Sequence, residues 1–144
     1  MIEAKNLPVV VAEIGGGSQF DERYLKRGVD GVTNALRHLG CLPGEAVKAP
    51  PQVLLNKMMI RRPRHGGILH PAVGADRLGQ SVPKDTLLGR TVDAQTFELL
   101  EEFRAPFDDT HLVLVRGVMS KVHPGDYAYM LGDLSGAERL DGVV

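Results

Sequence analysis

The residue with the clearest chemical potential in this chain is Glu13, which stands between an apolar run and a run of glycines. Residues 8–12 (Pro-Val-Val-Val-Ala) precede it, and Ile14 and residues 15–18 (Gly-Gly-Gly-Ser) follow it. A carboxylate at the C-terminal end of a buried strand can accept and donate protons, and glycines beside it let a substrate approach the backbone. Glu13 is therefore predicted to be a catalytic acid or base.

The other groups that could do chemistry lack the spacing of a known catalytic site. No His-x-x-Glu, His-x-x-x-His or Glu-x-x-His pattern occurs among the five histidines, which are His38, His65, His70, His111 and His123. The local spacing of a catalytic zinc site is therefore missing. Residues 15–18 also lack the lysine and hydroxyl of a phosphate-binding loop and the Gly-x-Gly-x-x-Gly spacing. We predict no metal ligands in this chain and no nucleotide site.

One basic cluster, residues 61–65 (Arg-Arg-Pro-Arg-His), is a second candidate site. Arg62, Arg64 and His65 could line the mouth of an active site for an anionic substrate, because guanidinium groups bind carboxylates well. The alternative is a plain solvated loop, and the sequence alone favours it. Both interpretations stay open.

Composition excludes several classes of partner. The 144 residues carry 17 basic and 18 acidic side chains and only 5% aromatics, so a nucleic-acid surface is not expected. No apolar run is long enough to cross a bilayer, and the first residues do not resemble a secretory signal. The single cysteine, Cys41, excludes an internal disulfide. A cytoplasmic protein with neither a nucleic-acid nor a membrane partner is the expectation.

Residues 1–48 are predicted to form one strand and one helix. The near-continuous apolar run Leu7–Ile14 is typical of a strand buried on both faces of a parallel or mixed sheet. Apolar residues at three- and four-residue spacing predict a helix from an N-cap at Asp21 to about Leu39. Gly40 is placed to end this helix. Gly28 and Gly31 inside it indicate close approach of another element, with tolerated weak spots as the alternative.

Residues 52–144 are predicted to form a β-rich domain after a linker that contains residues 41–44 and 49–51. Short strands separated by turn residues favour a small β-barrel or sandwich. The candidate strands are Val53–Arg62, Gly67–Val73, Thr86–Val92, Phe97–Ala105, His111–Val118 and Asp126–Leu131. Two stretches, Gly79–Leu87 and Ser120–Tyr127, share a valine, a proline-containing turn and a following strand. They indicate a weak internal duplication with two similar halves.

This second half resembles the barrel-sandwich hybrid of biotinyl and lipoyl carrier domains. The resemblance is carried by residues 79–88, 104–109 and 122–126. Carrier domains present a modified lysine in a hairpin between their two halves, whereas the similar stretch Met119-Ser120-Lys121 falls inside the second repeat. Asp109 also stands where carriers usually have glycine. No cofactor attachment is therefore expected.

The chain contains, in this order, Val11–Gly17, Phe20-Asp21, Gly28-Val29, Asn34–Gly40 and Gly66–Leu69, followed by the β-rich half. Together these pieces resemble the C-terminal part of the succinylglutamate desuccinylase and aspartoacylase family. Members of this family are zinc-dependent amide hydrolases that act on N-acyl amino acids. They have a carboxypeptidase-like α/β/α domain and an appended β domain that partly covers the active-site mouth. The resemblance implies that Glu13 is the glutamate that deprotonates the zinc-bound water.

The same resemblance implies that part of the active site lies outside this chain. In the family the zinc ligands and a substrate-binding Arg-Asn segment precede the strand that carries the glutamate, and this chain begins just before that strand. Zinc is thus expected in the full-length family but not bound by this chain alone. A structural or vestigial role for Glu13 is the alternative to an active one.

The expected fold class is α+β, with a strand-helix remnant of an α/β layer (1–48) followed by a barrel-sandwich hybrid domain (52–144). One functional hypothesis is the C-terminal portion of a zinc-dependent deacylase that supplies the general base and a lid and is inactive alone. The other is a stand-alone β-rich binding or oligomerisation module. An unpaired apolar strand edge predicts association, either with a second copy or with a missing N-terminal catalytic half.

Overall fold

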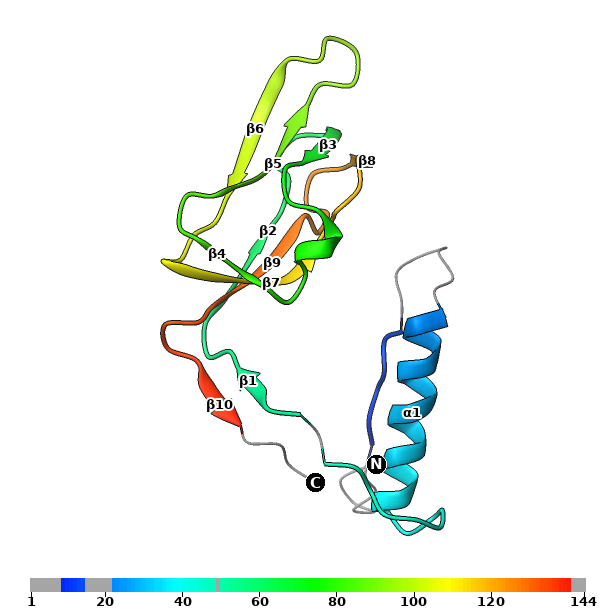
Figure 1. Cartoon of the computed structure of the whole chain (residues 1–144). Helices are drawn as coiled ribbons and strands as arrows, with labels where there is room; N and C mark the ends of the chain where they lie inside the picture. Colours follow the sequence, from blue (N-terminus) through cyan, green and yellow to red (C-terminus); the bar gives the residue numbers. More distant parts are fainter. Residues whose placement is uncertain (1–8, 15–21, 49, 141–144) are drawn as a thin grey trace. The chain divides into compact units, whose positions relative to one another are not determined.

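In residues 9–14, 22–48 and 50–140, which the computed structural model describes, the chain forms one α-helix, ten strands and one short 3-10 helix (Figure 1). It divides between Pro50 and Pro51 into two compact units. We call them the helical unit (residues 1–50, with 142–144) and the β unit (residues 51–141). The predicted α+β class is confirmed.

The helical unit is built on α1 (Glu22–His38). The helix ends in a Schellman motif, in which the amide of Cys41 donates to the carbonyl of Leu36 at 2.8 Å and that of Gly40 to Arg37 at 3.0 Å. Gly40 adopts the left-handed conformation that this motif requires, with φ of 72°. The predicted end of the helix is therefore confirmed. Asp21, its expected N-cap, lies outside the described residues.

The apolar segment before the helix differs from its prediction. Residues 9–14 form neither helix nor strand, and all six are exposed. Figure 1 shows the segment as an extended trace alongside α1. The prediction of a strand buried on both faces is wrong for these residues, because no described strand pairs with them. Residues 7 and 8 of the predicted strand lie outside the described part of the chain.

The two glycines within α1 have different surroundings. A Cβ atom at Gly28 would overlap the Cδ1 atom of Ile14, so the missing side chain lets Ile14 sit against the helix. A Cβ atom at Gly31 would meet no described atom within 4 Å. The predicted close approach is confirmed at Gly28 and is wrong at Gly31.

This difference predicts the effect of alanine at each position. Gly31→Ala should stabilise α1 by about 0.5 to 1 kcal/mol, because alanine loses less conformational freedom than glycine in a helix. Gly28→Ala should gain less, because the end of the Ile14 side chain must move. Amide hydrogen exchange of α1 measures both, and equal gains in protection would contradict the contact between Ile14 and Gly28.

The β unit contains two four-stranded antiparallel sheets and one two-stranded sheet. The four-stranded sheets have the orders β2-β9-β7-β4 and β6-β5-β3-β8, and the small sheet pairs β1 with β10. The strands are β1 (Gln52–Leu54), β2 (Met58–Arg61), β3 (Gly67–Pro71), β4 (Ser81–Pro83), β5 (Leu87–Val92), β6 (Leu99–Arg104), β7 (Asp109–Val115), β8 (Ser120–Val122), β9 (Tyr129–Asp133) and β10 (Glu138–Leu140), with the 3-10 helix η2 (Ala75–Arg77) after β3. None of the sheets in the described residues closes on itself, so the expected barrel is not formed.

The two large sheets have the same topology with their strands exchanged. If β2, β3, β4 and β5 are replaced by β6, β7, β8 and β9, and the reverse, one sheet order becomes the other. The similar stretches of the sequence are the equivalent turns that lead from one sheet to the other. Asp85 in the first turn has φ of 62° and Gly125 in the second has φ of 88°. The strand order thus agrees with the predicted internal duplication.

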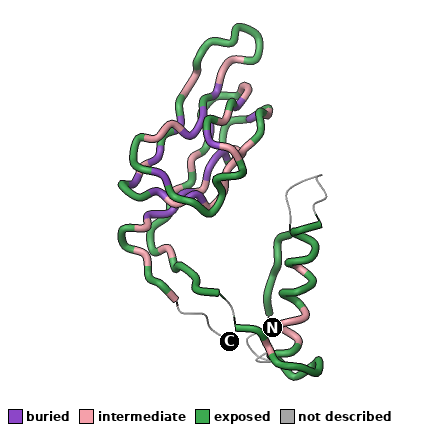
Figure 2. Tube along the Cα trace, viewed as in Figure 1, coloured by how far each residue is buried: buried purple, intermediate pink, exposed green. Residues whose placement is uncertain are grey.

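Both large sheets contribute to a single apolar core, the purple region of Figure 2. Tyr129 on β9 is completely buried and donates a hydrogen bond from its hydroxyl to the carbonyl of Leu88 on β5 at 2.9 Å. A Cβ atom at Gly89, the counterpart of Tyr129 in the other half, would overlap that hydroxyl. A large residue in one half therefore fills the space that a small one leaves in the other. The core residues are Leu69, Val73, Val82, Leu88, Phe103, Ala105, Phe107, Leu112, Val122, Ala128, Tyr129 and Leu131.

Most predicted strands have observed counterparts, but the boundaries differ. The predicted strand Val53–Arg62 is two strands, because β1 pairs with β10 whereas β2 pairs with β9 in another sheet. Between β1 and β2, where the chain changes from one sheet to the other, the Lys57 ammonium forms an ion pair with the Asp133 carboxylate at 3.0 Å. The sequence prediction also omitted β4, β8 and β10, each of which has only three residues.

Burial of Tyr129 predicts a loss of stability at high pH. Burial raises the pKa of Tyr129 from 10.0 to about 12. Its contribution to the free energy of unfolding is therefore complete below pH 10 and is lost as pH rises toward 12, by about 1 kcal/mol between pH 9 and pH 11. When the free energy of unfolding of Tyr129→Phe is measured with urea over this pH range, it should not show this loss.

Tyr127→Phe is the matched control, because Tyr127 is 46% exposed. It should show the same alkaline loss as the unsubstituted chain. An unchanged pH profile in Tyr129→Phe would contradict the assignment of this loss to the buried phenol.

Candidate functional site

Glu13 lies in the helical unit, one residue before the Ile14 side chain that rests on α1. Its carboxylate is exposed, and no described residue forms a hydrogen bond or ion pair with it. Among the described residues, Ile14 contacts the helix at Gly28, and this contact holds the end of the segment against α1. Glu13 is therefore accessible for proton transfer in this chain, and the glycines that follow it lie outside the described residues.

Arg62, Arg64 and His65 all lie in the β unit, on the loop between β2 and β3. The guanidinium of Arg62 donates to the carbonyl of Gly125 and stacks on the ring of Tyr127, 4.0 Å from its centroid. Arg104, the counterpart of Arg62 in the other half, donates in the same way to the carbonyl of Asp85 at 3.0 Å. Each arginine thus binds the positive-φ residue of one crossover turn, and the structure gives Arg62 a structural role.

Hydrogen bonds to backbone groups hold the part of the loop that contains Arg64 and His65. One carboxylate oxygen of Glu101, on β6, accepts hydrogen bonds from the amides of Arg64 at 2.8 Å and His65 at 3.3 Å. The carbonyl of Pro63 accepts a further bond from the amide of Gly125 at 2.9 Å. These bonds use only main-chain groups of the loop, and the side chains of Arg64 and His65 are exposed. Both side chains are therefore available to an anionic ligand on a positioned loop.

The turn that Arg62 binds through the Gly125 carbonyl also contains a charged residue, Asp126. The amide of His123 donates to the Asp126 carboxylate at 3.0 Å, and Arg116 lies 3.5 Å from the same oxygen. The His123 hydrogen bond and, less strongly, the Arg116 charge hold the pKa of Asp126 below its usual value. Asp126 therefore acts as an ionised turn-forming residue.

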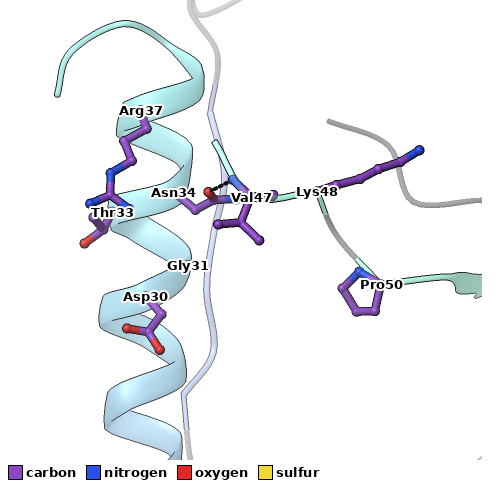
Figure 3. A pocket seen from close by; sticks show the side chains of 8 residues that line it. All are labelled: Asp30, Gly31, Thr33, Asn34, Arg37, Val47, Lys48 and Pro50. Atoms are coloured by element: carbon purple, nitrogen blue, oxygen red, sulfur yellow. Dashed lines mark hydrogen bonds between the residues drawn. The ribbon is translucent and has the colours of Figure 1, made fainter. Parts of the chain in front are cut away.

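A groove of about 590 Å³ lies on the polar side of α1 in the helical unit (Figure 3). Asn34 holds the segment after the helix against α1 on one side of this groove. Its side-chain amide donates to the carbonyl of Val47 at 2.9 Å, and its side-chain oxygen accepts from the Val47 amide at 2.6 Å. The lining residues are Asp30, Gly31, Thr33, Asn34, Arg37, Val47, Lys48 and Pro50. Neither Glu13 nor the basic loop contributes to it, so the groove is separate from the predicted site residues.

The described residues contain no group of three or more His, Cys, Asp or Glu side chains that could hold a metal ion.

The hairpin between the two halves of the β unit, residues 93–98, where carrier domains have their modified lysine, carries no lysine, and Lys121 lies on β8. No helix in the described part of the chain is long and apolar enough to span a membrane.

Two positioning residues were missed by the sequence analysis, Glu101 and Asn34. Neither has a local sequence signal, because each binds a backbone segment far along the chain. Glu101 contacts residues 36 and 37 positions away, and Asn34 contacts a residue 13 positions away. Only the paired strands or the packed loop bring these groups together.

The Glu101 contacts predict a loosened basic loop in Glu101→Ala. The amides of Arg64 and His65 should exchange with solvent roughly tenfold faster, because hydrogen bonds to a charged acceptor contribute about 1.5 to 3 kcal/mol. Glu98→Ala, an exposed glutamate at the start of the same hairpin arm, should leave both amides unchanged. Equal exchange rates in the two variants would show that the carboxylate does not hold the loop.

Comparison with known proteins gives one solved structure with the same fold. No protein-family model and no curated protein matches the chain. The structure is similar to a crystal structure from Shewanella amazonensis SB2B that is described as a succinylglutamate desuccinylase / aspartoacylase family protein. The TM-score is 0.62 and the sequence identity 18%, with 89% of this chain covered. The fold expected from the resemblance is therefore confirmed.

The match covers only 35% of the Shewanella amazonensis chain. The present chain thus spans about a third of the protein that it resembles. The similarity therefore concerns one part of the Shewanella amazonensis protein.

Proposed function

We propose that this chain is the C-terminal portion of an amide hydrolase that removes acyl groups from N-acyl amino acids. The observation that carries the proposal is the fold similarity to the Shewanella amazonensis protein over 89% of this chain. The accessible carboxylate of Glu13 supports it, as does the similarity in residues 11–17 and 34–40 on which the sequence resemblance depends. Glu13 is the general base and the β unit is a lid at the mouth of the site.

The chemistry of amide hydrolysis explains the role of Glu13. The attacking water must lose a proton before or as it bonds to the amide carbonyl carbon, and the leaving amine must gain one as the C–N bond breaks. One carboxylate can accept the first proton and donate it in the second step. The exposed position of Glu13, without a competing ion pair among the described residues, leaves both oxygens available for this transfer.

The family's zinc does not fit the described residues of this chain, since no suitable ligand cluster occurs among them. Residues outside the described part would have to hold the metal. The β unit would contribute Arg64 and His65, whose exposed side chains suit the carboxylate of an amino-acid substrate. The chain alone is therefore proposed to be inactive.

The test is Glu13→Gln in the assembled, active enzyme. Glutamine keeps the size of the side chain but cannot accept the proton, so kcat should fall about 10²- to 10⁴-fold while KM changes little. Deacylation of N-acetyl- and N-succinyl-amino acids is the assay.

Glu45→Gln is the matched control, an exposed glutamate in the same unit. Its kcat should remain within twofold of that of the unsubstituted enzyme. Full activity in Glu13→Gln would rule out the general-base role.

A second candidate, a stand-alone binding or oligomerisation module, is supported by the self-contained core of the β unit. The twelve residues of the apolar core all lie in residues 69–131, and none of the described residues of the helical unit is buried. Such a core does not need a catalytic domain to fold. Deacylase activity that depends on Glu13 in the assembled protein would reject this alternative.

A further inference from the structure

The groove on the polar side of α1 contains a glycine that the packing of the described residues does not explain (Figure 3). Gly31 lines this groove in the middle of the helix, where glycine costs about 0.5 to 1 kcal/mol relative to alanine. Its φ is not positive, and a Cβ atom there would meet no described atom within 4 Å. Neither its backbone conformation nor a described neighbour therefore requires a glycine at this position.

A bound ligand would explain Gly31. Glycine is favoured where a ligand must approach the backbone closely. A side chain at this position would take up part of the groove, because Gly31 lines it and no described atom lies in the way. The volume of the groove, about 590 Å³, lies within the range of small-molecule sites. The bare backbone at Gly31 thus keeps a space of ligand size open.

The side of the groove opposite the helix is preformed. Asn34, three residues after Gly31, binds both backbone groups of Val47, at 2.9 Å and 2.6 Å. These two hydrogen bonds hold the segment that brings the side chains of Val47 and Pro50 to the groove. Both side chains are apolar and exposed. A ligand therefore meets an apolar surface that it does not have to order, which lowers the cost of binding.

The charges at the groove favour an anion. Arg37 lines the groove about two turns along the helix from Asp30, and no described residue forms a hydrogen bond or ion pair with its guanidinium. Asp30 is already paired with the ammonium of Lys26 at 2.6 Å. Lys48 adds a positive charge on the segment opposite the helix. Among the described lining residues, the charges without an ion-pair partner are therefore positive.

The arrangement of these side chains indicates the shape of the ligand. Thr33 and Arg37 are four residues apart, so they are neighbours on the helix surface. A guanidinium and a hydroxyl can together donate several hydrogen bonds to a carboxylate or a phosphate. Figure 3 shows Thr33 and Arg37 on one side of α1 and Val47 and Pro50 on the other. A ligand that contacts both groups is therefore elongated.

We propose that this groove binds an elongated organic anion. Its carboxylate or phosphate head binds Arg37 and Thr33, and its apolar body passes over Gly31 to Val47 and Pro50. None of the site residues predicted from the sequence lines the groove. It is thus a second ligand site, and it does not rest on the proposed function.

Titration of the isotope-labelled chain, followed through its amide chemical shifts, tests the ligand class. Octanoate, octyl phosphate or both should bind saturably, with Kd below about 1 mM, and shift amides within residues 30–37 and 47–48. The tighter of the two identifies the head group. Octylammonium should bind about tenfold more weakly because it lacks the acceptor oxygens, and acetate likewise because it lacks the apolar body.

Substitutions in the groove test the site. Gly31→Leu should weaken binding about tenfold by filling the groove, while amide protection of α1 is kept, because leucine is a good helix former. Gly31→Ala should weaken it less. Arg37→Gln should weaken it about tenfold by removing the charge. Arg27→Gln is the matched control, since Arg27 is an exposed arginine of the same helix that does not line the groove, and it should stay within about twofold.

Several outcomes would overturn the proposal. One is the absence of saturable binding by both anions, and another is equally tight binding of octylammonium. Unchanged affinity in Arg37→Gln, or in a folded Gly31→Leu or Gly31→Ala chain, would give these residues a structural role only. Shifts confined to the exposed apolar side chains Leu25, Val29 and Val32 would mean that the octyl chain binds the other face of α1.

Discussion

The packing of the two large sheets of the β unit depends on one buried contact, the hydrogen bond from the Tyr129 hydroxyl to the Leu88 carbonyl at 2.9 Å. The same carbonyl accepts the amides of Ala72 at 2.8 Å and Val73 at 3.0 Å, so it joins β5, the chain after β3 and β9. The phenol reaches it only because Gly89 has no side chain. An unpaired phenol in this core would cost about 1 to 3 kcal/mol, so the hydrogen bond restricts how the two halves can pack.

The position of the basic loop follows from this arrangement. When β9 is held against β5, the turn before β9 lies where Gly125 can bind both Pro63 and Arg62. β6, paired with β5, carries Glu101 to the amides of Arg64 and His65. The loop is thus supported by both large sheets. The helical unit has no comparable core among its described residues. Its described contacts include the Schellman motif, the hydrogen bonds between Asn34 and Val47, and the packing of Ile14 on Gly28.

Local signals predicted the elements whose cause is local. Gly40 ends α1 because only glycine adopts its φ of 72° without strain, and that requirement is visible in the sequence. The two proline-containing turns were recognisable as similar, and their shared positive φ explains why. Elements whose cause is a distant partner were missed. The break between β1 and β2 arises where the chain changes sheets, and the three-residue strands β4, β8 and β10 exist only through pairing.

For the candidate site, the sequence by itself determined the residue types: a glutamate at the end of an apolar run, a basic loop and no zinc-ligand spacing. It also determined the helix and the α+β class, because periodicity and end signals act over a few residues. Only the tertiary structure decided that Arg62 supports a turn while Arg64 and His65 stay exposed on a held loop. It also decided that Val9 to Ile14 stay unpaired among the described residues. The reason is physical: a strand or an ion partner is defined by groups far along the chain, and a local pattern cannot specify which of them will be within reach.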